Sequence, residues 1–177
     1  VVAIAALVEI APGLILLNGR AVFAAIPGVL ALIPGLMQLR GCVGSSLAQR
    51  LSSAIHMGLV EWRDLKASLR SGLVIENVGA AAFLGVLSSA ALAIAVWLYC
   101  SAASMRCAHL AVLMALSVSV AALASAQAFL TVLVATYVTR RGLDPDNVTI
   151  PVVATVSDLL VSTLIVAMAC LIYAAAG

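Results

Sequence analysis

Charge is scarce in this sequence. Only 9% of its 177 residues are Asp, Glu, Lys or Arg, whereas 65% are hydrophobic and the mean hydropathy is +1.25. Soluble domains carry roughly a quarter charged residues, so this composition excludes a water-soluble fold. It predicts an all-α integral membrane protein in which residues 1–177 form a single transmembrane domain. Because Val1 begins inside an apolar run without a Met or a basic segment before it, we expect the domain to be cut from a longer chain.

The sequence also lacks the residue groups that bind soft metals and nucleic acids. Its four Cys and two His form no CxxC or Cys/His ligand pattern, so zinc and copper are not expected. No basic run with interleaved aromatics is present, so nucleic acid is not an expected partner. Cys100 and Cys107 flank one short loop and could pair if that loop faces an oxidising compartment. Packing as small apolar side chains is the favoured alternative.

Long apolar runs dominate what is present. A membrane-spanning helix needs about 20 such residues, and five segments qualify: 1–17, 21–54, 73–99, 108–138 and 150–175. The second segment contains Pro-Gly at 27–28 and again at 34–35, and its helix is predicted to kink or break. Such breaks in transporters commonly lie at ion sites. A proline kink with close glycine packing is the equally weighted alternative.

The basic residues are unevenly distributed between the two sets of loops. The loops around 61–70 and 139–141 carry five of them, whereas the opposite loops carry only Arg20 and Arg106. The positive-inside rule therefore predicts a multi-pass protein of the cell membrane with a cytoplasmic N-terminus and an extracytoplasmic C-terminus. The segment 61–70 is predicted to be an amphipathic helix at the membrane interface.

Asp158 is a lone carboxylate inside the last apolar segment. Counted from Pro151 at 1.5 Å per residue, it lies about 10 Å into the helix, near the middle of the bilayer. Thr155 and Ser162 share its helix face, and Ala154 keeps that face narrow. A charge at this depth is costly and is interpreted as functional. An interhelical hydrogen bond that only specifies packing contributes about 0.6 kcal/mol, less than the cost of burying the charge, so a compensating cation is expected.

Charge counting favours a divalent ion. One carboxylate suits a monovalent cation or a proton, whereas two copies of Asp158 on a two-fold axis supply a charge of −2. Mg²⁺ gives up its waters reluctantly and is well served by a few carboxylates. This hypothesis requires a homodimer, or a second such unit in one longer chain. Glu76 and Asn77, also inside an apolar run, either line the same path or satisfy a kink.

Two motifs resemble a known family. The stretches PDNVTIPVVATVSDL and PGLMQLRGCVGSSLAQRLSSA are similar to signatures of the MgtE magnesium channels and of solute carrier family 41. The resemblance covers essentially the whole chain as one five-helix unit with a broken second helix. It implies a Mg²⁺ pathway on a dimer axis, with Asp158 as the central ligand through bound water. It also places Ala154 and Gly41 where the family lends backbone oxygens or close approach to the hydrated ion. Further expected pore-lining positions are Glu76, Asn77, Thr155, Ser162, Gly44 and Pro151.

The motifs depart from the family at three places. Cys42 replaces the usual Asn, Gly44 or Ser45 stands where an acidic or polar residue is usual, and Ile150 replaces a polar residue before the helix-five Pro. The alternatives to a Mg²⁺ channel or transporter are an exchanger coupled to Na⁺ or H⁺ through Asp158 or Glu76, and a membrane assembly module without transport. An enzyme is not expected, because an intramembrane aspartyl protease needs two facing Asp residues.

Overall fold

The computed structural model describes residues 2–59, 70–105, 107–143 and 145–176, and these residues are helical apart from short connections. Four helices, α4, α6, α7 and α8, are long and apolar enough to cross a membrane by their length and composition. The helices are α1 (Val2–Val8), α2 (Ile10–Asn18), α3 (Arg20–Ala25), α4 (Val29–His56), α6 (Gly72–Ala102), α7 (Leu110–Arg140) and α8 (Pro145–Ala176). The all-α membrane fold is therefore confirmed.

The first predicted segment differs from the other four, because it forms two short helices instead of one long one. The chain turns at Glu9, between α1 and α2. Pro12 provides the reason: a proline lacks the backbone N–H, and its ring clashes with the carbonyl four residues earlier, here that of Val8. Among the described residues this region supplies only a shorter apolar helix, Ala6–Asn18.

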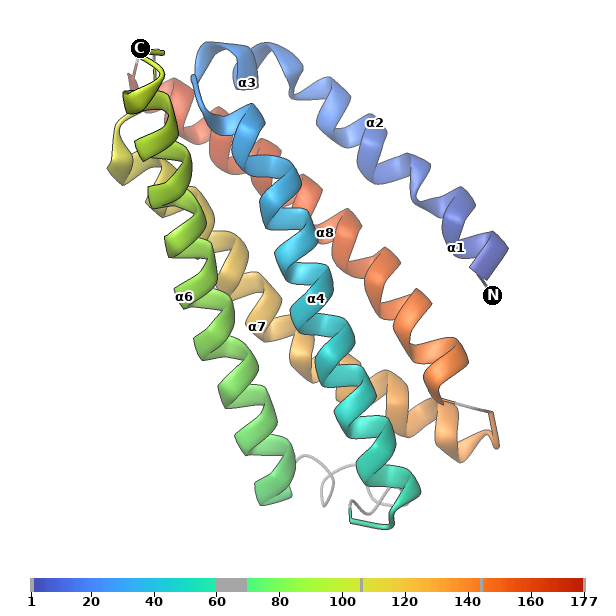
Figure 1. Ribbon diagram of the computed structural model, residues 1–177. Coiled ribbons are helices and arrows are strands. Elements are labelled where there is room, and N and C mark those ends of the chain that lie inside the picture. The colour runs from blue at the N-terminus through green and yellow to red at the C-terminus, as the bar shows by residue number, and fades with distance from the viewer. Residues whose placement is uncertain (1, 60–69, 106, 144, 177) are drawn as a thin grey trace.

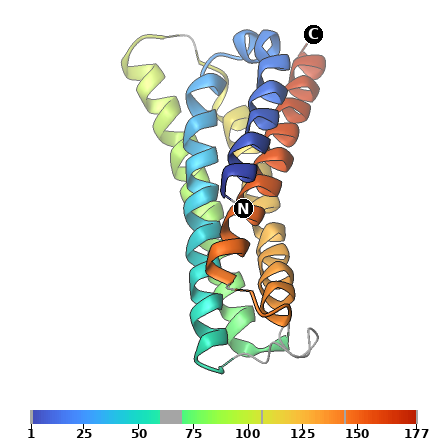
Figure 2. The same cartoon turned by 90° about the vertical axis from the view of Figure 1, so that its right-hand side faces the viewer.

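The four long helices alternate in direction and form one elongated bundle (Figure 1). Helix α7 packs against α6 on one side and against α8 on the other. Helix α4 contacts all three of them. The shorter α1 and α2 lie along α8 on the outside of the bundle (Figures 1 and 2). Position 40 of α4 and position 158 of α8 both fall near the middle of their helices, so the fold brings two membrane-length elements together at mid-height.

The predicted break of the second segment is present, between α3 and α4. Gly28 has a φ of +93°, a conformation that favours glycine. The Pro27 carbonyl, freed by the break, accepts a hydrogen bond from the Ala108 amide at 2.8 Å. Pro34, by contrast, lies inside α4 without ending it. The break lies twelve residues before Arg40, about 18 Å along the helix, so its backbone packs against the α6–α7 loop and not at mid-membrane.

Cys100 and Cys107 lie side by side at this break, and both are free thiols. A Cβ atom added at Gly28 would be 2.9 Å from the Cys107 Sγ and 3.9 Å from the Cys100 Sγ. Burial, and next the neighbouring Cys100 thiol, raise the pKa of Cys107 above its ordinary value. The Cys107 thiol is therefore held mostly protonated at neutral pH, packed as a small side chain against the break.

The apolar core is divided by a polar layer. One buried cluster fills the half of the bundle that contains Val29–Leu36 of α4, and a second fills the half that contains Leu47–Ala54. Between them, α4 carries Arg40, α7 carries Gln127 and α8 carries Ser157, all buried. Large hydrophobic side chains cover the outer faces instead, the surface a lipid-facing bundle requires. The two apolar clusters thus hold the helices together around a polar middle.

The ends of the bundle match the uneven charge of the loops. Arg70 and Arg141 lie at one end, whereas the C-terminus and the α6–α7 loop lie at the other (Figure 1). Which of these ends faces the cytoplasm stays a prediction. The predicted interfacial helix at 61–70 falls almost entirely on residues 60–69, which lie outside the described residues.

Candidate functional site

Asp158 forms an ion pair with Arg40. The Arg40 Nη2 donates to the Asp158 Oδ1 across 118 residues of sequence, joining the middle of α4 to the middle of α8. The Arg40 side chain is 7% exposed and that of Asp158 15% exposed. A buried carboxylate needs a partner of opposite charge, and the compensating cation expected from the sequence is, in this structure, a side chain of the same protomer.

Arg40 keeps unused hydrogen-bonding capacity. A guanidinium has five N–H donors, and the buried Nε of Arg40 has no hydrogen-bond partner among the described residues. A buried N–H without a partner costs free energy that water or a ligand would recover. The Arg40 side chain is therefore held by its contact with Asp158 and is otherwise weakly fixed.

Glu9 is a second carboxylate beside Asp158. It occupies the turn between α1 and α2, which lie along α8, and its side chain is half-buried. The Glu9 carboxyl lies near Thr155 and Asp158, close enough for its charge to interact with that of Asp158 and, more weakly, with that of Arg40. Two acidic groups and one guanidinium thus form a single cluster at mid-bundle, with a formal charge of −1 when all three are ionised.

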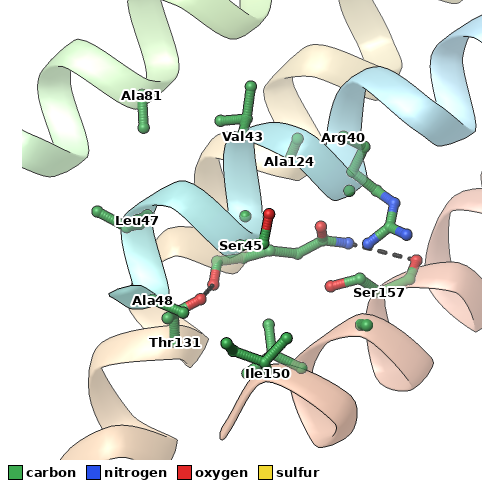
Figure 3. A pocket seen from close by; sticks show the side chains of 15 residues that line it. Arg40, Val43, Ser45, Leu47, Ala48, Ala81, Ala124, Thr131, Ile150 and Ser157 are labelled. Atoms are coloured by element: carbon green, nitrogen blue, oxygen red, sulfur yellow. Dashed lines mark hydrogen bonds between the residues drawn. The ribbon is translucent and has the colours of Figure 1, made fainter. Parts of the chain in front are cut away.

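A cavity lies directly beside this cluster. The space in it that water can occupy is about 40 Å³, and Arg40 forms one of its walls. Figure 3 shows Arg40 reaching from α4 toward α8, next to Ser157, with Ile150 at the opposite wall of the cavity. The Gln127 amide of α7 donates to the Ser157 carbonyl at 3.5 Å. Polar groups from three helices therefore meet at mid-height in an otherwise apolar bundle.

Three residues predicted for the ion path, Gly41, Gly44 and Ala154, line this cavity together. A Cβ atom added at Gly41 or Gly44 would meet nothing within 4 Å. The two glycines therefore widen the cavity and are not required for close helix contact. Ile150, the residue that departs from the family pattern, forms part of the same wall and makes it more apolar.

The predicted polar stripe of α8 faces inward. Thr155 is 8% exposed and Ser162 is fully buried, on the same side as Asp158. Their hydroxyls donate to carbonyls of their own helix, Thr155 to Pro151 at 2.9 Å and Ser162 to Leu159 at 3.1 Å. Both hydroxyls are therefore satisfied by their own helix in this structure.

Glu76 and Asn77 lie away from the Asp158 cavity. Glu76 is exposed. The Asn77 amide donates to the Leu73 carbonyl at 2.8 Å and accepts from Arg50 at 3.3 Å, in a separate groove between α4 and α6. Cys42 is exposed, on the side of α4 that faces this groove. The structure therefore does not bring Glu76 and Asn77 together with Asp158.

Sequence reasoning missed the partners of Asp158. Arg40 lies in the second apolar segment and Glu9 in the first, and neither was paired with Asp158. Both carried the signal that singled out Asp158, a charge at membrane depth. Among the described residues, no three His, Cys, Asp or Glu side chains come together as a metal-ligand group, so the cluster is a mixed acid–base site.

The chain is similar to known transporters. The family model MgtE, described as "Divalent cation transporter", matches residues 33–169. Solute carrier family 41 member 2 from Gallus gallus, Mus musculus and Homo sapiens is 31% identical over 140 residues, 78% of this chain and 24% of each relative. The chain thus spans about a quarter of the length of these curated relatives. The family model covers most of α4 and α8, including Arg40 and Asp158. The chain belongs to the MgtE family of divalent cation transporters.

Proposed function

We propose that this chain transports divalent cations, chiefly Mg²⁺, across a membrane, and that Asp158 is the acidic residue of its cation site. The observation that carries the proposal is a carboxylate at the middle of a membrane-length helix, beside a cavity that Gly41, Gly44 and Ala154 line. Membership of the MgtE family supports the divalent class of the ion.

The chemistry of the cavity suits an ion that keeps its waters. Mg²⁺ dehydrates reluctantly and is usually bound through one or two carboxylates, whereas Ca²⁺ takes six to eight oxygen ligands. Asp158 offers one carboxylate, and the small residues Gly41, Gly44 and Ala154 line the cavity beside it, where bound water would complete the shell. Asp158 would then attract the ion by charge and hold its hydration shell by hydrogen bonds.

Flux into liposomes tests the function. Purified chain in vesicles loaded with a Mg²⁺-sensitive dye is expected to admit Mg²⁺ at least about tenfold faster than empty vesicles, because a site at mid-membrane lowers the cost of crossing hydrocarbon. Uptake that is unchanged by Na⁺ and pH gradients would indicate a channel, and uptake that follows either gradient an exchanger. Equal uptake with and without protein contradicts the proposal and favours a membrane assembly module.

The two-fold dimer is a further part of the proposal. Asp158 keeps 15% of its side chain exposed, so a second copy can approach it, and most soluble and membrane homo-oligomers are closed and symmetric. Light scattering of the detergent-solubilised protein is expected to give twice the single-chain mass of 18.0 kDa. A single-chain mass under conditions that preserve transport would exclude the dimer axis as the cation site.

A further inference from the structure

The sequence suggested that two carboxylates meet only when two copies of Asp158 lie on a two-fold axis. In the structure, a single protomer already has two carboxylates near each other, those of Glu9 and Asp158. Glu9 lies in the turn between α1 and α2, which pack along α8, close enough for its charge to interact with that of Asp158. The position between two carboxylates is one that a divalent cation would occupy. In this structure the Arg40 guanidinium is bound to one of the two, Asp158.

We propose that Arg40 is a tethered counter-ion: it neutralises the Glu9–Asp158 pair in the ion-free protein and is displaced when a divalent cation binds there. This inference rests on the proposed function. It adds Glu9 as a second acidic ligand and makes Arg40 the residue that competes with the transported ion.

Three features support displacement over a fixed ion pair. Arg40 is buried yet has an Nε without a partner among the described residues, so Asp158 is its main anchor. Arg40 also lines a cavity, which Gln127 and Thr131 help to enclose. Gly41, the next residue, leaves open space at its Cβ position. Among the described residues, displacement of Arg40 therefore breaks its bond to Asp158 and leaves the guanidinium beside other polar side chains.

The charge balance favours exchange. With Arg40 in place the cluster carries −1, which attracts a cation from solution only weakly. Once Arg40 has turned away, the two carboxylates present −2 to an entering Mg²⁺. Since the cation binds only the displaced state, its apparent affinity is reduced by the fraction of time for which the site is free. Arg40 would thus determine the affinity of the site for the cation. By competing for Asp158, it would also keep the cation's dissociation fast enough for transport.

Equilibrium binding of Mn²⁺, a divalent probe with a spectroscopic signal, tests the inference in the detergent-solubilised full chain. Arg40→Gln is expected to raise Mn²⁺ affinity at least about 10-fold, because the competing guanidinium is gone. Glu9→Gln is expected to lower it at least about 10-fold, because one ligand charge is lost. Arg50→Gln is the matched control, since Arg50 lies on the same helix but bonds Asn77 outside the cavity. Its affinity is expected to stay within about twofold of the wild type.

The outcomes separate this inference from the proposed function. If Arg40→Gln binds Mn²⁺ no more tightly than Arg50→Gln, or if Glu9→Gln matches the wild type, the tethered counter-ion is overturned even though Asp158→Asn abolishes binding. If the wild type binds no Mn²⁺ at all, the proposed cation site itself fails.

A second measurement covers the case in which Arg40→Gln does not fold. The structure of the wild-type protein with Mn²⁺ is expected to show the ion between Glu9 and Asp158, with the Arg40 guanidinium no longer in contact with Asp158. Mn²⁺ bound with the Arg40–Asp158 ion pair intact would overturn the displacement.

Discussion

Asp158→Asn is expected to lower Mg²⁺ uptake into liposomes by at least about 100-fold, since loss of an interaction worth about 2.7 kcal/mol or more corresponds to two decades. Asn has nearly the same shape as Asp, so the variant removes charge and little else. A neutral amide cannot offset the dehydration and field cost of a divalent ion at mid-membrane. Asp158→Glu, which restores the charge on a longer side chain, is expected to recover part of the uptake.

The ion pair complicates this experiment and also provides its control. Asp158→Asn leaves the buried guanidinium of Arg40 without its partner, and breaking a buried pair from one side costs about 3–5 kcal/mol. Reduced uptake by the single variant alone does not distinguish loss of transport from loss of folded protein. The double variant Asp158→Asn, Arg40→Gln removes both charges and is expected to regain most of that stability in thermal unfolding. If it is stable and still inactive, the loss belongs to the carboxylate; if it transports at the wild-type rate, Asp158 is not the cation ligand.

The helices could be predicted from the sequence because hydrocarbon length and proline chemistry are local constraints. The apolar runs predicted the four long helices, and Pro27–Gly28 predicted the break that precedes α4. Pro12 carried the same kind of signal for the turn at Glu9, but the prediction treated residues 1–17 as one helix. The inward face of α8 followed from the spacing of Thr155, Asp158 and Ser162.

The partners of Asp158 could not be predicted in the same way, because they depend on the register between helices far apart in sequence. Arg40 and Asp158 are separated by 118 residues, and nothing local fixes their relative height. The position of an acid within an apolar run does not by itself predict that it joins the site. Glu76 also lies in such a run, yet its side chain is exposed. A global rule, that buried charges must be neutralised, would have paired Arg40 with an acid but would not have chosen between Glu9, Glu76 and Asp158.

Gly41→Leu is expected to lower Mg²⁺ uptake by at least about 30-fold while leaving the protein folded. Gly41 lines the cavity beside Arg40, and a side chain there would extend into the space through which we expect the hydrated ion to pass. Leucine offers no oxygen to replace bound water, so it both narrows the path and makes it apolar. Gly41→Ala, which adds one methyl group, is expected to reduce uptake no more than about threefold.

Local packing makes this variant informative. A Cβ atom at Gly41 meets nothing within 4 Å, and Leu stabilises a helix relative to Gly by up to about 1 kcal/mol, so thermal unfolding is not expected to occur at lower temperature. Gly79→Leu is the matched control: it makes the same change at an exposed position of α6 where a Cβ also meets nothing within 4 Å, away from the cavity. If both variants transport like the wild type, the cavity is not the ion path. If both lose uptake equally, the effect arises from helix packing in the membrane, and the path through Gly41 is not supported.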